Sequence, residues 1–155
     1  MRQLFLLAAL LLLSDAYSSA QVDCVQNRTS KVSDIQGVVV DPFGIAVPAA
    51  TVTAWDQNGH VASTQTNAVG RFSIRTSKGK YEFKASMHAF EDGKVELIVR
   101  RNVFSSLRHE QLYVILGLAG SYCSWVTTSD KDFEYNIRAN KKRSKEFEQK
   151  NATQK

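Results

Sequence analysis

The sequence predicts an all-β fold, a sandwich or a barrel, and three observations carry this prediction. Apolar and polar residues alternate with a period of two over residues 35–128, as they do in half-buried strands. Turn-forming Gly, Pro and Asn residues interrupt the alternation at short intervals. No stretch shows a convincing helical period. Seven or eight short strands at this spacing indicate a sandwich or a barrel.

The turns delimit the predicted strands. Pro42 fixes its own φ and Gly44 can take a positive φ, so residues 41–44 are expected to form a turn. Asn58-Gly59 is the strongest short signal for a hairpin. The predicted strands are residues 35–40, 50–55, 60–66, 71–76, 81–87, 94–99 and 112–118, with 121–128 as a further edge or closing strand.

The same alternation predicts which side chains point inward. A small sandwich needs most of its inward positions simply to form a hydrophobic core. Loops and sheet faces are then left for function. The predicted core residues are Val38, Val40, Val52, Phe72, Ile74, Tyr81, Phe83, Leu97, Val99, Val114 and Leu116.

The first 20 residues have the three parts of a secretory signal peptide. Arg2 supplies the positive charge, residues 4–13 form an unbroken apolar run, and Ser18 and Ala20 are small residues at the spacing that signal peptidase recognises. A membrane-spanning helix needs about 20 apolar residues, so this run is too short to be an anchor. The sequence therefore predicts cleavage after Ala20 and a secreted or periplasmic protein without a membrane span.

Charge and composition divide the rest of the chain. Twelve basic and twelve acidic residues balance between Gln21 and Ile137, so the net charge of +5 comes from the last 18 residues, which form no predicted apolar face. The high pI therefore gives no support to a nucleic-acid-binding domain. The predicted segments are a signal peptide (1–20), an N-terminal linker (21–34), a β-sandwich (35–128) and a charged tail (129–155), which is expected to be disordered or a frayed helix.

Two cysteines, Cys24 and Cys123, remain after the predicted cleavage. An even number of cysteines in an oxidising compartment indicates a disulfide. The alternative is two free buried thiols. Two isolated cysteines without a nearby histidine make a poor metal site.

Three motifs follow one another along the predicted strands. Residues 37–55, GVVVDPFGIAVPAATVTAW, contain a Gly-x-Val-x-Asp strand, a glycine turn, a proline and Ala-x-Val. Residues 66–72, TNAVGRF, have the pattern Thr-Asn-x-x-Gly-x-Phe. Residues 79–90, GKYEFKASMHAF, have Gly-x-Tyr followed by an alternating strand. In this order the three motifs resemble the carboxypeptidase regulatory-like domain family over about residues 35–118.

This resemblance implies a seven-stranded Greek-key, prealbumin-like β-sandwich. It also implies a non-catalytic accessory role in an exported or outer-membrane bacterial protein, since that is the usual role of such domains. One departure is that Ala89 precedes Phe90, where the family often has glycine, which leaves the shape of that turn open. The other is that such domains commonly precede an enzyme or a membrane barrel, whereas the charged tail follows this one.

The residues predict neither catalysis nor a metal or other cofactor. His60, His88 and His109 lie 28 and 21 residues apart, so no two have the spacing of a local metal clamp. The sequence contains no GxSxG, no HExxH and no glycine-rich phosphate loop. Carboxylates such as Glu91 and Asp92 are expected to be solvated turn charges. The sequence therefore predicts a protein that is not an enzyme.

Trp55 is the candidate for ligand stacking. It lies on the strand face opposite Val52 and Ala54. It is therefore either a core residue, the commoner outcome, or an exposed platform for a carbohydrate or peptide. The leading hypothesis is a secreted, non-catalytic binding or structural module for a protein or polysaccharide of the cell envelope. A sheet edge that accepts an added strand is one way in which it could engage its partner. The alternatives are a carbohydrate-binding module and a transthyretin-related hydrolase, whose terminal Tyr-Arg-Gly-Ser motif this chain lacks.

Overall fold

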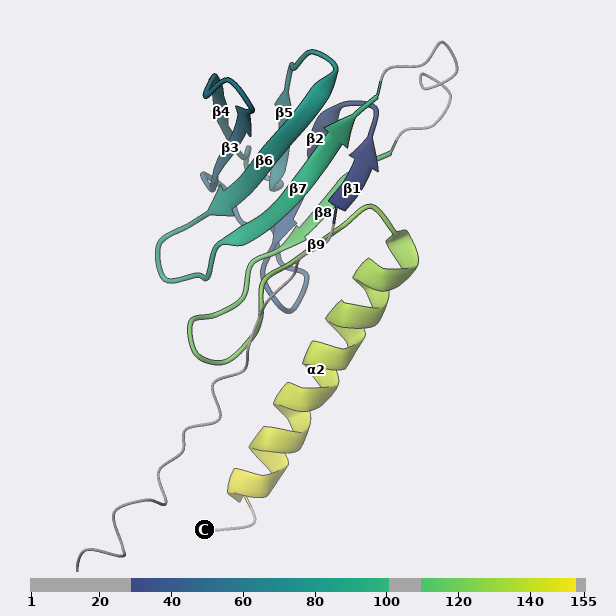
Figure 1. Ribbon diagram of the computed structural model, residues 1–155. Helices are drawn as coiled ribbons and strands as arrows, with labels where there is room; N and C mark the ends of the chain where they lie inside the picture. Colours follow the sequence, from purple (N-terminus) through teal and green to yellow (C-terminus); the bar gives the residue numbers. More distant parts are fainter. Residues whose placement is uncertain (1–28, 101–109, 153–155) are drawn as a thin grey trace, which may run out of the picture.

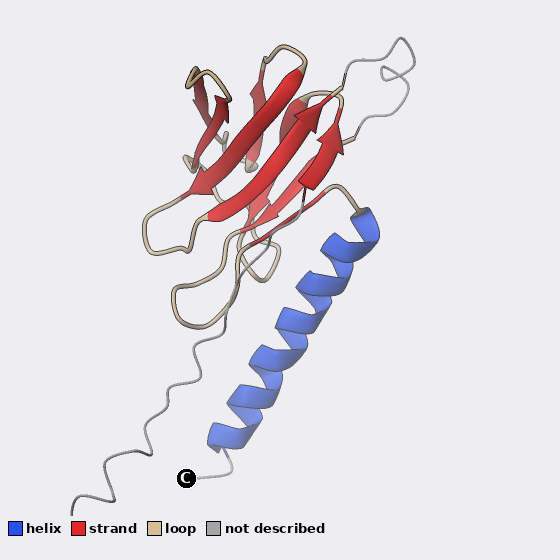
Figure 2. Ribbon diagram, in the orientation of Figure 1, coloured by secondary structure: helices blue, strands red, loops and turns tan. Residues whose placement is uncertain are grey.

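A computed structural model describes residues 29–100 and 110–152, and their strands form two sheets packed face to face. Figure 1 shows the five-stranded sheet, with the order β1-β7-β6-β3-β4, in front of the four-stranded sheet, with the order β5-β2-β8-β9. The bounds are β1 Thr29–Val32, β2 Ile35–Val40, β3 Thr51–Asp56, β4 Val61–Gln65, β5 Arg71–Ile74, β6 Gly79–Ser86, β7 Gly93–Val99, β8 Leu112–Ile115, β9 Trp125–Thr127 and α2 Asp130–Ala152. Figure 2 shows that α2 follows the last strand.

The strands follow a Greek-key path. β3 and β4 form an antiparallel hairpin, and the chain then crosses to the other sheet as β5. β6 returns to pair antiparallel with the free side of β3, and β7 pairs with β6. In the four-stranded sheet, β2 lies between β5 and β8. This arrangement confirms the predicted β-sandwich.

The hydrophobic core lies between the two sheets, and the predicted core residues other than Val38 are buried. Val38 is only partly buried, because Ile35, Gly37 and Val39 are the β2 residues that face the interior. Val40, at the end of the strand, is also buried. The prediction for Val38 was wrong because a run of three valines contains no polar residue that would fix which positions point inward.

The predicted N-terminal linker contains a strand. β1 pairs in parallel with β7, with Thr29 opposite Glu96, and Val32 is buried. The linker assignment was therefore wrong for residues 29–32. Because β1 has a single large apolar residue and a partner that lies 67 residues away in sequence, local alternation could not reveal it.

The predicted tail was expected to be disordered or a frayed helix, and the structure has a helix over residues 130–152, so disorder is wrong for these residues. Ser129 caps the helix: its Oγ accepts a hydrogen bond from the N–H of Asp132 at 3.2 Å. Asp130 and Asp132 lie in the first turn, where negative charge favours a helix.

One side of α2 docks on the sandwich. Phe133, Ile137, Asn140 and Ser144 are partly buried and recur at helical spacing. Asn140 Nδ2 donates a hydrogen bond to the carbonyl oxygen of Pro42 at 3.1 Å. The later half of the helix projects past the sandwich (Figure 1). The sequence showed no apolar face because the stripe is half polar and its two apolar residues precede the basic segment.

The turn between β6 and β7 contains Ala89, at the position where the resembled family often has glycine. Ala89 adopts a φ of 69°, in the left-handed region that glycine usually occupies. The N–H of Phe90 donates to the carbonyl oxygen of Met87 at 3.1 Å and closes the turn. The turn therefore keeps the backbone shape of a glycine turn, at a cost of about 1–2 kcal/mol for the alanine Cβ.

Three predictions fall on residues outside the described part of the chain. These are the signal peptide over residues 1–20, the position of Cys24 and the position of His109. Within the described ranges, no helix has the length and apolar character needed to cross a membrane.

Candidate binding face on the five-stranded sheet

The side of the five-stranded sheet that points away from the core, here called the outer face, carries charged residues at alternate positions. Lys80, Glu82 and Lys84 point outward from β6. Lys94 and Glu96 point outward from β7. Figure 1 shows this face in front, with no described element lying over it.

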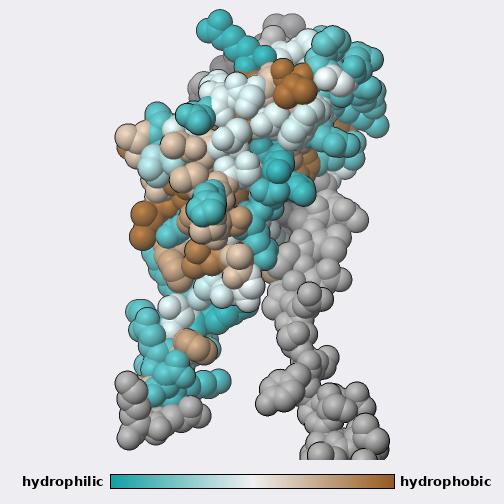
Figure 3. All heavy atoms as spheres, turned by 90° about the vertical axis from the view of Figure 1, so that its left-hand side faces the viewer, coloured by the Kyte–Doolittle hydropathy of each residue, from teal (hydrophilic) through white to brown (hydrophobic). Residues whose placement is uncertain are grey.

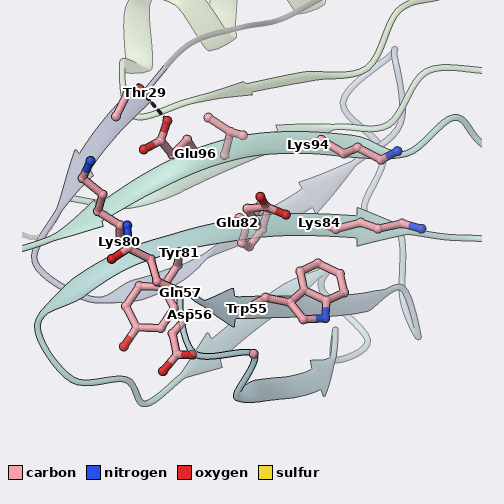
Figure 4. A pocket seen from close by; sticks show the side chains of 13 residues that line it. Thr29, Trp55, Asp56, Gln57, Lys80, Tyr81, Glu82, Lys84, Lys94 and Glu96 are labelled. Carbon is pink, nitrogen blue, oxygen red and sulfur yellow. Dashed lines mark hydrogen bonds between the residues drawn. The ribbon is translucent and has the colours of Figure 1, made fainter.

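One row of side chains crosses four strands of the outer face. Glu82 and Glu96 lie directly opposite each other on β6 and β7, an arrangement of like charges that is unfavourable by itself. On one side Thr29 Oγ1 donates a hydrogen bond to Glu96 Oε2 at 3.3 Å (Figure 4). On the other side Trp55 of β3 is the register partner of Glu82. The two carboxylates thus lie between a hydroxyl and an indole.

The adjacent row is basic. Lys84 and Lys94 lie opposite each other, and Asp92 Oδ2 is 2.8 Å from Lys84 Nζ and 3.8 Å from Lys94 Nζ. Asp92, expected to be a solvated turn charge, therefore bridges the two lysines. Such partly exposed ion pairs each contribute at most about 1 kcal/mol to stability. The outer face consequently presents neighbouring rows of opposite charge.

Trp55 lies on the outer face and is partly exposed, whereas Val52 and Ala54 of the same strand are buried. Core packing, the commoner outcome for tryptophan, is therefore wrong here. Trp55, Glu82 and Lys84 line a shallow depression that extends over β3, β6 and β7. Figure 4 shows the indole beside the β6 side chains, with Lys84 extending in the same direction.

The turn between β3 and β4 closes one end of the depression. Asp56 Oδ1 accepts hydrogen bonds from the backbone N–H groups of Asn58 at 2.8 Å and His60 at 2.9 Å. The other carboxylate oxygen lies 3.0 Å from His60 Nδ1. The hydrogen bond from the His60 N–H is the main cause that lowers the pKa of Asp56. Asp56 and His60 therefore order the hairpin turn.

The two histidines in the described ranges lie at opposite ends of this sheet. His60 follows the turn at Asp56, where β3 ends, whereas His88 follows Ser86, which pairs with Thr51 at the start of β3. A six-residue strand spans roughly 17 Å between its first and last residues. The two side chains are exposed and too far apart to share a site. No group of three or more His, Cys, Asp or Glu among the described residues could hold a metal ion.

The loop between β8 and β9 contains Cys123. Ser124 ties this loop down, because its Oγ donates to the carbonyl oxygen of Glu91 at 2.7 Å and accepts from the N–H of Gly117 at 2.8 Å. Cys123, the cysteine within the described ranges, is not a free thiol. Since Cys24 lies outside the described residues, its pairing with Cys123 stays a prediction.

The charged rows are the part of the site that sequence reasoning missed. The sequence contained a signal for these rows, because four of the five residues occupy alternate positions in the neighbouring predicted strands 81–87 and 94–99, and Lys80 directly precedes the first of them. Aligning those strands across their connecting turn would have placed the two glutamates opposite each other and the two lysines in the next row. The residues are Lys80, Glu82, Lys84, Lys94 and Glu96.

Comparisons with known proteins give a family match and several structural likenesses. Residues 34–109 match the carboxypeptidase regulatory-like domain. The chain is similar to the 5-hydroxyisourate hydrolase of Klebsiella pneumoniae, with a TM-score of 0.48 and 15% identity, over 64% of this chain and 100% of that one. It is also similar to the 3-chlorocatechol 1,2-dioxygenase of Rhodococcus opacus 1CP, with a TM-score of 0.39 and 12% identity, over 63% of each chain. No curated protein sequence matches.

The matched region contains the three motifs, whose glycines have definite roles in the structure. A Cβ on Gly37 would lie 2.0 Å from the carbonyl oxygen of Leu112, so β2 can approach β8 this closely only with glycine. Gly70 has a φ of 74°, and its N–H donates to the carbonyl oxygen of Asn67 at 2.9 Å. Residues 34–109 thus match the carboxypeptidase regulatory-like domain, and the strands β2 to β7 within this range contribute to both sheets of the β-sandwich.

Proposed function

We propose that this protein is a non-catalytic binding module that engages a protein or polysaccharide through the outer face of its five-stranded sheet. The observation that carries the proposal is the position of Trp55. Its indole lies on the solvent side of the sheet, in a shallow depression next to Glu82 and Lys84. A large aromatic side chain at such a place supplies contact area without costing the fold a core residue.

The chemistry of the outer face suits recognition. An indole offers a flat apolar surface for a sugar ring or a peptide side chain, and its N–H can donate a hydrogen bond. The flanking carboxylates accept hydrogen bonds, and the lysines donate them. The combination of one aromatic anchor with orienting polar groups is typical of ligand sites and of interface hot spots.

The same proposal holds that the protein does not catalyse a reaction. A catalytic site needs a nucleophile or an acid–base pair held in mutual contact in a sheltered place. The contact between His60 and Asp56 lies in an exposed turn, where the carboxylate mainly serves backbone N–H groups. His88 lies at the other end of the sheet. This arrangement favours binding over a hydrolase of the transthyretin-related type.

We further propose that the module works outside the cytoplasm. The support is the three-part signal sequence, which predicts a mature chain beginning at Gln21. The partner would then be a component of the cell envelope or of the external medium. The oxidising environment would also allow Cys24 and Cys123 to form a disulfide.

The proposal is tested with a Trp55→Ala variant. Purified polysaccharides and proteins of a bacterial envelope are immobilised, and retention of the whole chain is compared with that of the variant. Truncation of a buried tryptophan at an interface costs about 2 kcal/mol or more, so a loss of roughly thirtyfold in affinity is expected. Tyr135→Ala is the matched control, because Tyr135 is an aromatic residue of α2 that is 70% exposed and lies off the outer face. Equal affinities of the wild type and Trp55→Ala for every retained partner would refute the proposal.

A further inference from the structure

β4 forms an edge of the five-stranded sheet. In that sheet it pairs only with β3, and the neighbouring β5 belongs to the other sheet. Figure 1 shows no described element on the outer side of β4, and Figure 3 turns this side of the molecule toward the viewer. Much of the surface in that view is pale, the colour of residues of intermediate hydropathy.

The register between β3 and β4 identifies the backbone groups of β4 that do not bond to β3. The N–H of Asp56 donates to the carbonyl oxygen of His60, and the N–H of Thr66 donates to that of Ala50, both at 3.0 Å. In an antiparallel pair every second residue bonds to the partner, so the even-numbered residues from 60 to 66 face β3. The N–H and C=O groups of the residues between them point away from the sheet, and these are Val61, Ser63 and Gln65.

The β4 edge lacks the features that normally block pairing. Its sequence, VASTQ, contains no charged residue, no proline and no glycine. The other edge strands differ, because β1 carries Lys31 and β5 carries Arg71. β9 has three residues and is contacted by α2. β4 is therefore the edge most open to an added strand.

We propose that the β4 edge accepts an extended peptide segment of a partner protein, which adds to the sheet as a sixth strand. This inference rests on the proposed binding function and names its partner as a protein. Val61, Ser63 and Gln65 each offer one N–H and one C=O, so six main-chain groups lie along the edge. An extended polypeptide matches this repeat of donors and acceptors, whereas a polysaccharide has no such backbone.

Side chains along the edge indicate what the guest strand should carry. Val61, Ser63 and Gln65 project onto the outer face and are exposed, Val61 to 58%. Val61 is the register partner of Trp55, so a guest residue beside Val61 extends the row that contains the indole. An apolar or aromatic residue is expected at that position, with uncharged polar residues beside Ser63 and Gln65.

The size of the edge favours a peptide over a second copy of this chain. Stable protein–protein interfaces bury about 1,200 Å² or more, which a five-residue edge does not reach without further contacts. A peptide segment needs only the main-chain bonds and one or two side-chain contacts.

The test uses random 12-residue peptides displayed on phage and selected on the immobilised whole chain. Selected peptides are synthesised and titrated against the wild type, Ser63→Pro and Ser63→Ala. Proline removes the outward N–H of residue 63 and the serine hydroxyl but no backbone hydrogen bond to β3, so a loss of roughly tenfold or more in affinity is expected. Alanine keeps the N–H and removes only the hydroxyl that bonds to Val52 O and Thr53 Oγ1, so it should bind like the wild type.

Amide hydrogen exchange on the wild type provides a readout that does not depend on the proline variant folding. In the free protein the N–H groups of Val61, Ser63 and Gln65 should exchange rapidly, and a selected peptide should slow all three. The inference is overturned if no peptide is selected, if these amides are unaffected, or if Ser63→Pro binds like the wild type. It is also overturned if the edge proves to be occupied by a second copy. Loss of binding in Trp55→Ala with full binding in Ser63→Pro would refute the edge and leave the proposed function standing.

Discussion

Tyr113 of β8 and Phe133 of α2 stack, with ring centroids 4.5 Å apart and planes inclined by 23°. The carboxylate of Asp130, at the start of the helix, also lies near enough to the Tyr113 hydroxyl to raise its pKa. These contacts join α2 to the four-stranded sheet, so the C-terminal segment is part of the folded unit. They also make the two sides of the sandwich different, because the outer face of the five-stranded sheet is not covered by the helix.

The aromatic stack predicts a measurable contribution of the helix to stability. Phe133→Ala should lower the free energy of unfolding by about 1–2 kcal/mol, since it removes the ring contact and part of a docked side chain. Phe147→Ala is the control, because Phe147 is 66% exposed and should change the value by less than about 0.5 kcal/mol. Urea unfolding measures both variants. Equal effects of the two substitutions would show that α2 does not dock through Phe133.

The contact between Tyr113 and Asp130 predicts a loss of stability at alkaline pH. The hydrogen bond to Asp130 is the main cause that raises the pKa of Tyr113 above 10.0, and burial adds to it. A raised pKa stabilises the fold below pH 10 and loses that contribution as the pH rises through the raised value. The difference in unfolding free energy between the wild type and Tyr113→Phe should therefore narrow above pH 10. Urea titrations at pH 8 and at several higher values test this, and a constant difference would contradict it.

The left-handed Ala89 predicts a stabilising substitution. Ala89→Gly should raise the free energy of unfolding by about 0.5–1 kcal/mol, because relief of the Cβ strain outweighs the greater freedom of glycine in the unfolded chain. Ala68→Gly serves as the control, since Ala68 is exposed in a turn and has no positive φ. The control should be neutral or slightly destabilising. A thermal or urea unfolding series that shows the same sign for both would refute the explanation.

A disulfide between Cys24 and Cys123 is predicted for exported protein. In the chain-entropy model, closing a loop of about 100 residues stabilises the fold by about 4–5 kcal/mol, and often by less in practice. Intact mass measured after alkylation, with and without reductant, should show two thiols only in the reduced sample. Two alkylated thiols in non-reduced protein would contradict the pairing.

Local sequence patterns predicted the strands β2 to β9, because most of them combine period-two alternation with a turn signal and β8 lies in an apolar run of strand length. They failed where structure depends on distant partners. β1 forms because β7 offers an edge, and α2 docks because Tyr113 supplies the opposing ring. The charged rows depend on the register between β6 and β7, which alternation within one strand does not define.

Trp55 shows the same limit at the level of a single side chain. Alternation placed it opposite Val52 and Ala54, and Val52 was itself a predicted core residue, but this alone did not outweigh the usual burial of tryptophan. The buried partners Phe83 and Ala85 on β6 decide this, because they place Val52 and Ala54 inside. Trp55 is left on the outer face.

Recognition through the outer face is tested most directly by the fluorescence of Trp55. A Trp125→Phe variant leaves Trp55 as the one tryptophan of the chain, which contains two. Its emission is recorded while a partner retained by the wild type, protein or polysaccharide, is added. The account predicts a saturable shift of the emission to shorter wavelength, over the same concentrations at which binding saturates, because the partner covers the indole. Saturated binding with unchanged Trp55 emission would place the partner elsewhere and contradict the account.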